Sequence, residues 1–109
     1  MKFLTLLRFK PGIPPNPEMG IAVNNAVKEW IKGNLASKAL DCAFNVMPNH
    51  SGIYGMCITN ANSLEEAFAQ LASYPAYAIT DFEVLPLTDV NQAIDKVNAV
   101  FQQMAAMMR

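Results

Sequence analysis

The sequence predicts a single α+β domain over residues 1–109, with the element order β-α-β-β-α-β followed by one further helix. Short apolar runs bounded by turn residues alternate with segments in which apolar residues recur at helical spacing. A chain of 109 residues has the length of one domain. Apolar residues make up 52% of the chain and charged residues 16%, a composition that excludes intrinsic disorder.

The charge of the chain is nearly balanced, with 8 Lys and Arg against 9 Asp and Glu and a formal net charge of −1. Such a chain has no excess charge to attract nucleic acid or anionic lipid. The early apolar run, residues 3–7, is too short for the core of a signal peptide. No run approaches the roughly 18 apolar residues of a membrane span. We therefore expect neither a nucleic-acid nor a membrane partner, and a cytoplasmic location.

The first third of the chain is expected to form one strand and one helix. Residues 2–10 form an apolar run edged by basic residues, which predicts a strand covered on both faces. Residues 11–17 contain four prolines and are predicted as a connecting loop, because neither a helix nor a central strand tolerates that density. Helical spacing of apolar residues then predicts a helix over 18–32, which Gly33 and Asn34 should stop.

The middle of the chain predicts a hairpin. Two strands, about 40–47 and 53–59, lie on either side of a Pro-Asn-His-Ser-Gly turn. If the turn centres on its Asn and His, Cys42 lies opposite Cys57; a shift of one residue breaks this pairing.

A second helix is predicted over about 64–73. It begins at Ser63, whose hydroxyl can cap the amides of the first turn while Glu66 reaches back to the Ser63 amide.

The last two predicted elements are a strand over about 78–85, closed by Pro86, and a helix over about 89–108 with apolar residues at helical spacing. The complete order is the split βαβ, or ferredoxin-like, arrangement.

The first two helices of this arrangement can cover only one face of a four-stranded sheet. Because an open apolar face is a liability for a monomer in water, we expect a homodimer with its sheets face to face, or a larger ring of dimers. The final helix could cover its own sheet edge or reach a neighbouring subunit, although ordinary core packing is the plainer interpretation.

Five short stretches resemble those of a known family in their order and spacing. They are Phe9-Lys10-Pro11, Lys28-Glu29, His50 with Tyr54, Ser63-Leu64-Glu65-Glu66 and Asp81-Phe82-Glu83-Val84. The chain thereby resembles the dimeric α+β barrel superfamily, and within it the muconolactone isomerase-like proteins. The resemblance covers most of residues 1–86, and the C-terminal helix departs from it.

The resemblance implies a cofactor-free isomerase that acts on a small carboxylate or lactone. A fold hosts several functions, so two alternatives stay open. One is a non-catalytic module for small-ligand binding or assembly, and the other is a cofactor-independent monooxygenase.

Isomerisation of a lactone needs a base that removes a proton next to a carbonyl, an acid that returns one, and a donor for the enolate oxygen. It requires no metal or cofactor. His50 is the only histidine, and histidine is the residue type suited to move a proton near neutral pH. As a residue of the hairpin turn, it could equally be a solvated side chain.

Charged residues on two neighbouring strands are the other candidates. Alternation places Arg8 and Lys10 on one face of the first strand, and Asp81 and Glu83 on one face of the fourth. In the functional interpretation, Arg8 or Lys10 holds a substrate carboxylate and an acidic residue takes part in proton transfer. In the structural interpretation, Arg8 forms an ion pair, which lowers the pKa of the carboxylate and makes it a weaker base.

Tyr54 and Tyr77 could donate hydrogen bonds to a substrate, or could serve in packing.

Cys42 and Cys57 have no basic neighbour in sequence to lower their pKa, so neither is expected to act as a nucleophile. Two cysteines and one histidine make no recognisable zinc spacing, and no metal is expected.

Overall fold

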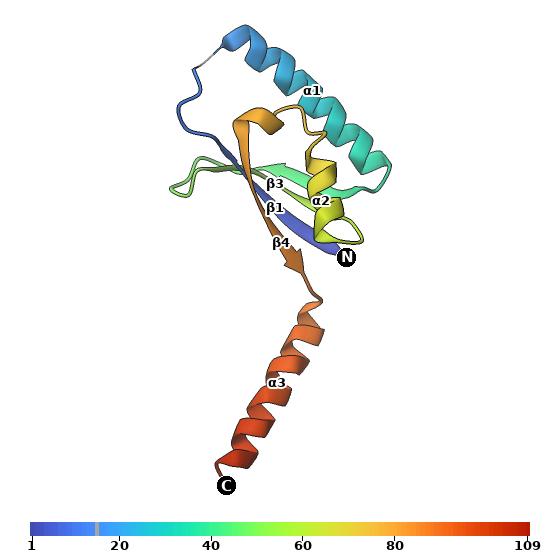
Figure 1. Ribbon diagram of the computed structural model, residues 1–109, viewed down its shortest axis with the longest axis vertical. Coiled ribbons are helices and arrows are strands. Elements are labelled where there is room, and N and C mark those ends of the chain that lie inside the picture. Colours follow the sequence, from blue (N-terminus) through green and yellow to red (C-terminus); the bar gives the residue numbers. More distant parts are fainter. Residues whose placement is uncertain (15) are drawn as a thin grey trace.

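The computed structural model describes residues 1–14 and 16–109. Four antiparallel strands form one sheet in the order β2-β3-β1-β4. The elements in chain order are β1 (Lys2–Phe9), α1 (Pro17–Ala36), β2 (Leu40–Asn45), β3 (Ile53–Asn60), α2 (Leu64–Leu71), the 3-10 helix η1 (Tyr77–Ile79), β4 (Thr80–Leu87) and α3 (Val90–Met107) (Figure 1). This order and topology confirm the predicted βαββαβ fold with a C-terminal helix.

Alternation along β1 separates the two sides of the sheet. Phe3, Thr5 and Leu7 are buried on the side that α1 and α2 cover. Leu4 and Leu6 point to the opposite side and are only half-buried. We call this opposite side the open face. By strand register, its apolar side chains include Leu4, Leu6, Ile58 and Leu85.

Two small clusters form the core on the covered side. Phe3 packs with Ala61 and Ala67 beneath α2. The second cluster centres on Leu7, Tyr74 and Ala76, with Val23, Val27, Trp30, Tyr54, Ile79 and Phe82 packed against it. No residue of α1 is fully buried, although its apolar side faces the sheet. Helix α1 therefore does not pack tightly against the sheet.

The C-terminal end of α1 differs from the prediction. The expected stop at Gly33 and Asn34 is wrong, because the helix continues to Ala36. The Asn34 side-chain amide donates to the Trp30 carbonyl oxygen at 2.7 Å, one turn back, so the asparagine is accommodated within the helix. The chain changes direction only after α1, where Lys38 adopts a left-handed φ of 65°.

The start of α2 follows the prediction in part. The Ser63 hydroxyl accepts from the Glu66 amide at 3.1 Å, as expected for a cap. The Glu66 carboxylate accepts from the Asn62 amide and not from that of Ser63, so the reciprocal bond lies one residue earlier than predicted. The helix ends at Leu71, two residues before the predicted end.

The register of the β2–β3 hairpin is also corrected. Cys57 lies opposite Ala43, and Cys42 lies opposite Ile58, so the predicted pairing of the two cysteines is wrong. The register is constant from Cys42 to the turn, so the turn sets the offset; an irregularity shifts the pairing by one residue only beyond Cys42, at Leu40. Both thiols are free.

Strand β4 begins and ends later than predicted. Residues 77–79 form η1, so the strand starts at Thr80 and not at 78. It then continues through Pro86 to Leu87. A proline is tolerated there because β4 is an edge strand of the sheet.

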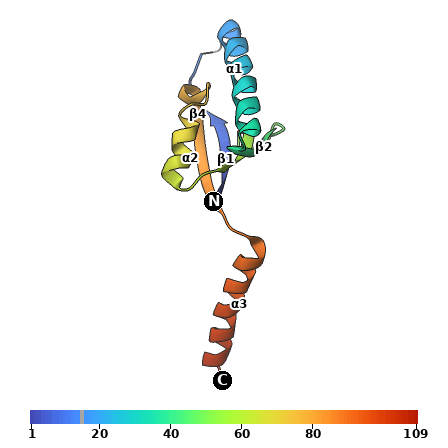
Figure 2. The same ribbon diagram turned by 90° about the vertical axis from the view of Figure 1, so that its right-hand side faces the viewer.

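Helix α3 gives the molecule its elongated shape. In both views it points away from the sheet, α1 and α2 (Figures 1 and 2). The principal extents are 68 × 33 × 23 Å and the radius of gyration is 18.4 Å. A compact domain of this length would have a radius of gyration of about 13 Å. Within residues 1–14 and 16–109, no helix combines the length and apolar character needed to cross a membrane.

Candidate functional site

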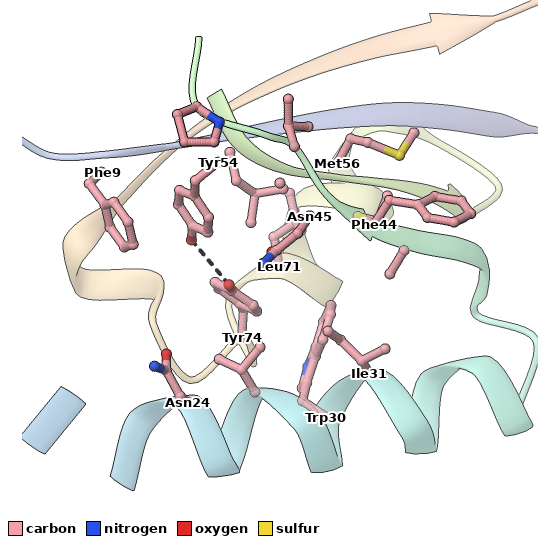
Figure 3. Close-up of a pocket in the computed structure, with 17 residues that line it drawn as sticks. Phe9, Asn24, Trp30, Ile31, Phe44, Asn45, Tyr54, Met56, Leu71 and Tyr74 are labelled. Carbon is pink, nitrogen blue, oxygen red and sulfur yellow. Dashed lines mark hydrogen bonds between the residues drawn. The ribbon is translucent and has the colours of Figure 1, made fainter. Parts of the chain in front are cut away.

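A cavity separates α1 from the covered side of the sheet (Figure 3). It has two adjoining chambers, with volumes of about 500 Å³ and about 710 Å³. Both volumes lie within the range of small-molecule sites. The residues that line both chambers are Phe9, Asn24, Val27, Tyr54 and Tyr74.

We name the chambers by the elements that complete them. The β2 chamber, the smaller one, is also lined by Trp30, Ala43 and Leu71. The η1 chamber, the larger one, is also lined by Lys10 and Ile79. The shared residues form the boundary between them, so a ligand that contacts Tyr54 can extend into either chamber.

Gly55 contributes to the space beneath α1. It lies opposite Leu7 on β1 and lines the β2 chamber. A Cβ atom added there would lie 3.5 Å from the Phe44 carbonyl oxygen and 4.0 Å from the nearest Leu7 methyl, which are ordinary contacts. A larger side chain would extend from the sheet toward the chamber. Glycine at this position therefore helps to keep the cavity open.

Tyr54 reaches the cavity because of an irregularity in β3. Strand β1 pairs Leu7 with Gly55 and Arg8 with Ile53, which leaves Tyr54 as the extra residue between them. Such a bulge can redirect a side chain relative to strict alternation. The Tyr54 ring consequently lies on the covered side of the sheet and points toward Tyr74 (Figure 3).

The hydroxyls of Tyr54 and Tyr74 lie at the boundary of the chambers, and the buried Thr80 hydroxyl contacts Tyr54 from outside the lining of both chambers. The Tyr54 hydroxyl lies 3.1 Å from that of Tyr74 and 2.8 Å from that of Thr80. Each hydroxyl carries one proton, and the two contacts use two of the three. When Thr80 donates to Tyr54, the third proton lies on Tyr54 or Tyr74 and is available to an oxygen atom of a ligand.

The surroundings keep Tyr74 protonated. Burial raises the pKa of its phenol, and the hydrogen bond with Tyr54 raises it further. At neutral pH this hydroxyl is therefore a hydrogen-bond donor and not a base.

Aromatic rings form much of the wall. Phe9 stacks on Tyr54 with ring centroids 4.0 Å apart and an interplanar angle of 11°. Trp30 meets Tyr74 edge-on at 5.2 Å, and its indole N–H donates to the Ser73 hydroxyl at 2.8 Å. Walls of this kind favour a planar or cyclic ligand.

Among the residues that the structure places around the chambers, Lys10 alone carries a charge. Asn24 and Asn45 add amide groups. Cys57 lines the β2 chamber, where burial raises the pKa of its thiol and keeps it neutral. The lining thus offers hydrogen bonds and one positive charge, but neither a carboxylate nor an imidazole.

Two of the residues predicted from sequence, Tyr54 and Lys10, lie at the cavity. Lys10 follows the last residue of β1, so strand alternation does not extend to it, and it borders the η1 chamber on the covered side. Tyr77 lies outside the lining, half-exposed and stacked against Phe82 at 5.7 Å. His50 is exposed in the hairpin turn.

The other predicted residues lie together on the open face. Arg8 is opposite Asp81 in the register, and its Nη1 lies 3.1 Å from Oε1 of Glu83. Its Nε also donates to the Ser51 carbonyl oxygen at 3.0 Å. The structure brings these charges together as expected, but on the opposite side of the sheet from the cavity.

Sequence reasoning did not identify Phe9, Tyr74 or Thr80 as site residues. They come from the end of β1, the loop after α2 and the start of β4, so no local spacing connects them. Trp30, on α1, is half-buried and lines the cavity as well. No group of three or more His, Cys, Asp or Glu side chains that could hold a metal occurs in the described part of the chain.

No protein-family model and no curated protein matches the sequence. Several solved structures share its fold, and two of them are informative. The crystal structure of muconolactone isomerase superposes with a TM-score of 0.68 at 16% identity, over 82% of this chain and 90% of that one. The chain has the muconolactone isomerase fold.

The second structure is 5-chloro-2-hydroxyhydroquinone dehydrochlorinase from Burkholderia phenoliruptrix in complex with 2,5-dihydroxybenzoquinone. Its TM-score is 0.61 at 15% identity, over 84% of this chain and 98% of that one. Both proteins are members of the dimeric α+β barrel family. The likeness confirms the resemblance and the fold inferred from the sequence; at this identity it concerns the fold alone.

Proposed function

We propose that the cavity between α1 and the sheet binds a small cyclic ligand that carries a carboxylate, carbonyl or enol oxygen. The observation that supports this most is the pair of Tyr54 and Tyr74 hydroxyls at the junction of two mostly apolar chambers, with the Thr80 hydroxyl bonded to Tyr54. A few polar groups placed in a mostly apolar cavity are typical of small-molecule sites.

Each part of the proposed ligand has a counterpart in the lining. The stacked rings of Phe9 and Tyr54 suit a flat or cyclic body. The unused hydroxyl proton suits a carbonyl or enol oxygen, which is a strong acceptor. The Lys10 ammonium at the η1 chamber suits a carboxylate.

The two proteins of the same fold support this ligand class. One is named for a lactone, and the other was solved with a dihydroxybenzoquinone, and both of these are oxygenated rings. We infer that this chain takes a ring of similar size.

A second candidate function is cofactor-free isomerisation of a small lactone or carboxylate. The likeness to muconolactone isomerase favours it, and the hydroxyl cluster could donate to an enolate oxygen. Proton abstraction would require a base, and the candidates His50, Asp81 and Glu83 lie outside the lining. Ligand binding without turnover therefore accounts for more of the described cavity than isomerisation does.

We also propose that the chain forms a homodimer in the cytoplasm. The half-exposed apolar side chains of the open face, Leu4 and Leu6 among them, support contact with a second sheet. The free thiols Cys42 and Cys57 suit a reducing compartment.

Calorimetric titration tests the proposed binding, with muconolactone and 2,5-dihydroxybenzoquinone as probes. Tyr54→Phe removes a hydroxyl from the cluster and should weaken binding about tenfold, the value of one hydrogen bond. Tyr77→Phe removes a hydroxyl outside the cavity and is the matched control. Binding that neither substitution changes would place the ligand elsewhere, and no binding of either probe would reject this ligand class.

A further inference from the structure

Helix α3 carries a long apolar stripe that its own domain leaves uncovered. No residue of α3 is buried, and the helix points away from the sheet (Figure 2). Apolar residues recur along one side of the helix at alternating spacings of four and three positions, and we call this row the seam. The seam residues are Val90, Ile94, Val97, Phe101, Met104 and Met108. This repeat of 3.5 residues is typical of a helix that packs along another helix.

The rest of α3 favours another protein surface as the neighbour. Ala93, Val100 and Met107 widen the stripe on one side. The charged residues within the helix are Asp95 and Lys96, and neither lies in the seam. Helices that lie on membranes usually carry a polar face rich in Lys and Arg, whereas the polar residues here are mostly Asn and Gln.

The order of the seam residues is self-complementary in the antiparallel direction. About a two-fold axis at Ala99, Val97 of one copy faces Phe101 of the other. The same axis places Ile94 against Met104, and Val90 against Met108. Each layer then combines a β-branched side chain with a longer one, which favours interdigitation. The residues that flank the seam, Ala93, Val100 and Met107, follow the same two-fold symmetry. Ala93 of one copy lies near Met107 of the other, and Val100 lies near Val100 of the other copy.

We propose that α3 pairs antiparallel with α3 of a second copy of this chain. The pair has two-fold symmetry, so one surface serves both partners. A helix of this length is about 27 Å long, and one face of it falls short of the roughly 800 Å² that each partner buries in a stable interface. The antiparallel arrangement brings Met107 and Met108 beside the other copy's Val90, next to the end of its β4. Strand β4 also contributes to the open face, which can extend the interface.

Sedimentation velocity on the full chain tests the pairing. Phe101→Glu places a charge in the layer that Phe101 forms with Val97 of the other copy. Gln103→Glu places the same charge away from the seam and is the matched control. We expect Gln103→Glu to keep the mass of the wild type and Phe101→Glu to raise the dissociation constant at least tenfold. Equal masses for the two variants, or a wild-type chain that stays monomeric at high micromolar concentration, would overturn the proposal.

Disulfide trapping tests the direction of the helices. In a Cys42→Ser background, the double variant Ile94→Cys with Met104→Cys should form a covalent dimer under mild oxidation. Ile94→Cys alone should not, because the two copies of residue 94 lie ten positions, or about 15 Å, apart along an antiparallel pair. Trapping of the single variant would indicate a parallel pair, and trapping of neither would indicate that α3 binds some other surface; either result contradicts the proposal.

Discussion

The hydroxyl oxygens of Tyr54 and Tyr74 lie 3.1 Å apart where the two chambers of the cavity meet. One residue comes from β3 in the middle of the sheet, and the other from the segment that follows α2. Their contact joins the sheet to the segment that closes the cavity beside α1. It also fixes two hydrogen-bonding groups in a mostly apolar space, which is the basis of the proposed ligand site.

The charge of Lys10 should contribute to the binding of anionic ligands. Lys10→Gln keeps most of the length of the side chain and removes its charge at the η1 chamber. We expect a three- to tenfold loss of affinity for a ring with a carboxylate, because an exposed charge contributes about 1 kcal/mol. Lys28→Gln on the outer side of α1 should change nothing. Calorimetry distinguishes the two, and equal affinities would remove Lys10 from the site.

Burial of Tyr74 should make stability depend on alkaline pH. Its pKa is raised above the ordinary value of 10.0, so above that pH the unfolded chain loses a proton that the folded chain keeps. The free energy of unfolding therefore falls as pH rises past about 10, by at most about 1.4 kcal/mol per pH unit. Urea denaturation between pH 9 and 11 should show a flatter profile for Tyr74→Phe. Parallel profiles would contradict the burial of an undissociated phenol.

The ion pair of Arg8 with Glu83 should contribute little. The two side chains are 34% and 47% exposed, and such pairs contribute at most about 1 kcal/mol. We expect Arg8→Ala and Glu83→Gln to fold, to lose less than that amount and to bind cavity ligands as the wild type does. A tenfold loss of affinity in both variants would instead support the anion site that the sequence suggested on this face.

Thr5 offers a test of the core. Its side chain is fully buried, and its hydroxyl has no hydrogen-bond partner among the described residues. Thr5→Val keeps the shape and removes the unpaired hydroxyl, so the free energy of unfolding should rise by up to about 1 kcal/mol. Thr59→Val, at a buried hydroxyl that contacts the Cys57 sulfur at 4.0 Å, should show no such gain. A loss of stability in Thr5→Val would reveal a partner for the Thr5 hydroxyl.

The order of elements could be predicted because it depends on periodicity and turn residues, which are local in sequence. The register could not. The turn between β2 and β3 sets a register one residue away from the predicted one over residues 42–45, and the bulge at Tyr54 turns its ring to the covered side. Neither the exact centre of a turn nor a bulge leaves a clear mark in an alternating apolar pattern, so the assumed turn centre misplaced the cysteines.

The position of the candidate site was harder to predict for a different reason. The apolar stripe of α1 looks the same in sequence whether the helix closes on a sheet or stands off from it. Arg8 and Glu83 were predicted as site residues because charges on neighbouring strands suggest a site, and the two side chains do form an ion pair. Phe9, Tyr74 and Thr80 became visible as a group only when the fold brought three distant segments together.

Chemical-shift mapping tests the central claim most directly. The chain has a single tryptophan, so its indole N–H gives one resolved signal from the wall of the β2 chamber. On titration with muconolactone or 2,5-dihydroxybenzoquinone, we expect that signal to move together with the amides of Phe9, Tyr54 and Tyr74. Shifts confined to Arg8, Asp81 and Glu83, with the indole signal unmoved, would place the ligand on the open face and contradict the account.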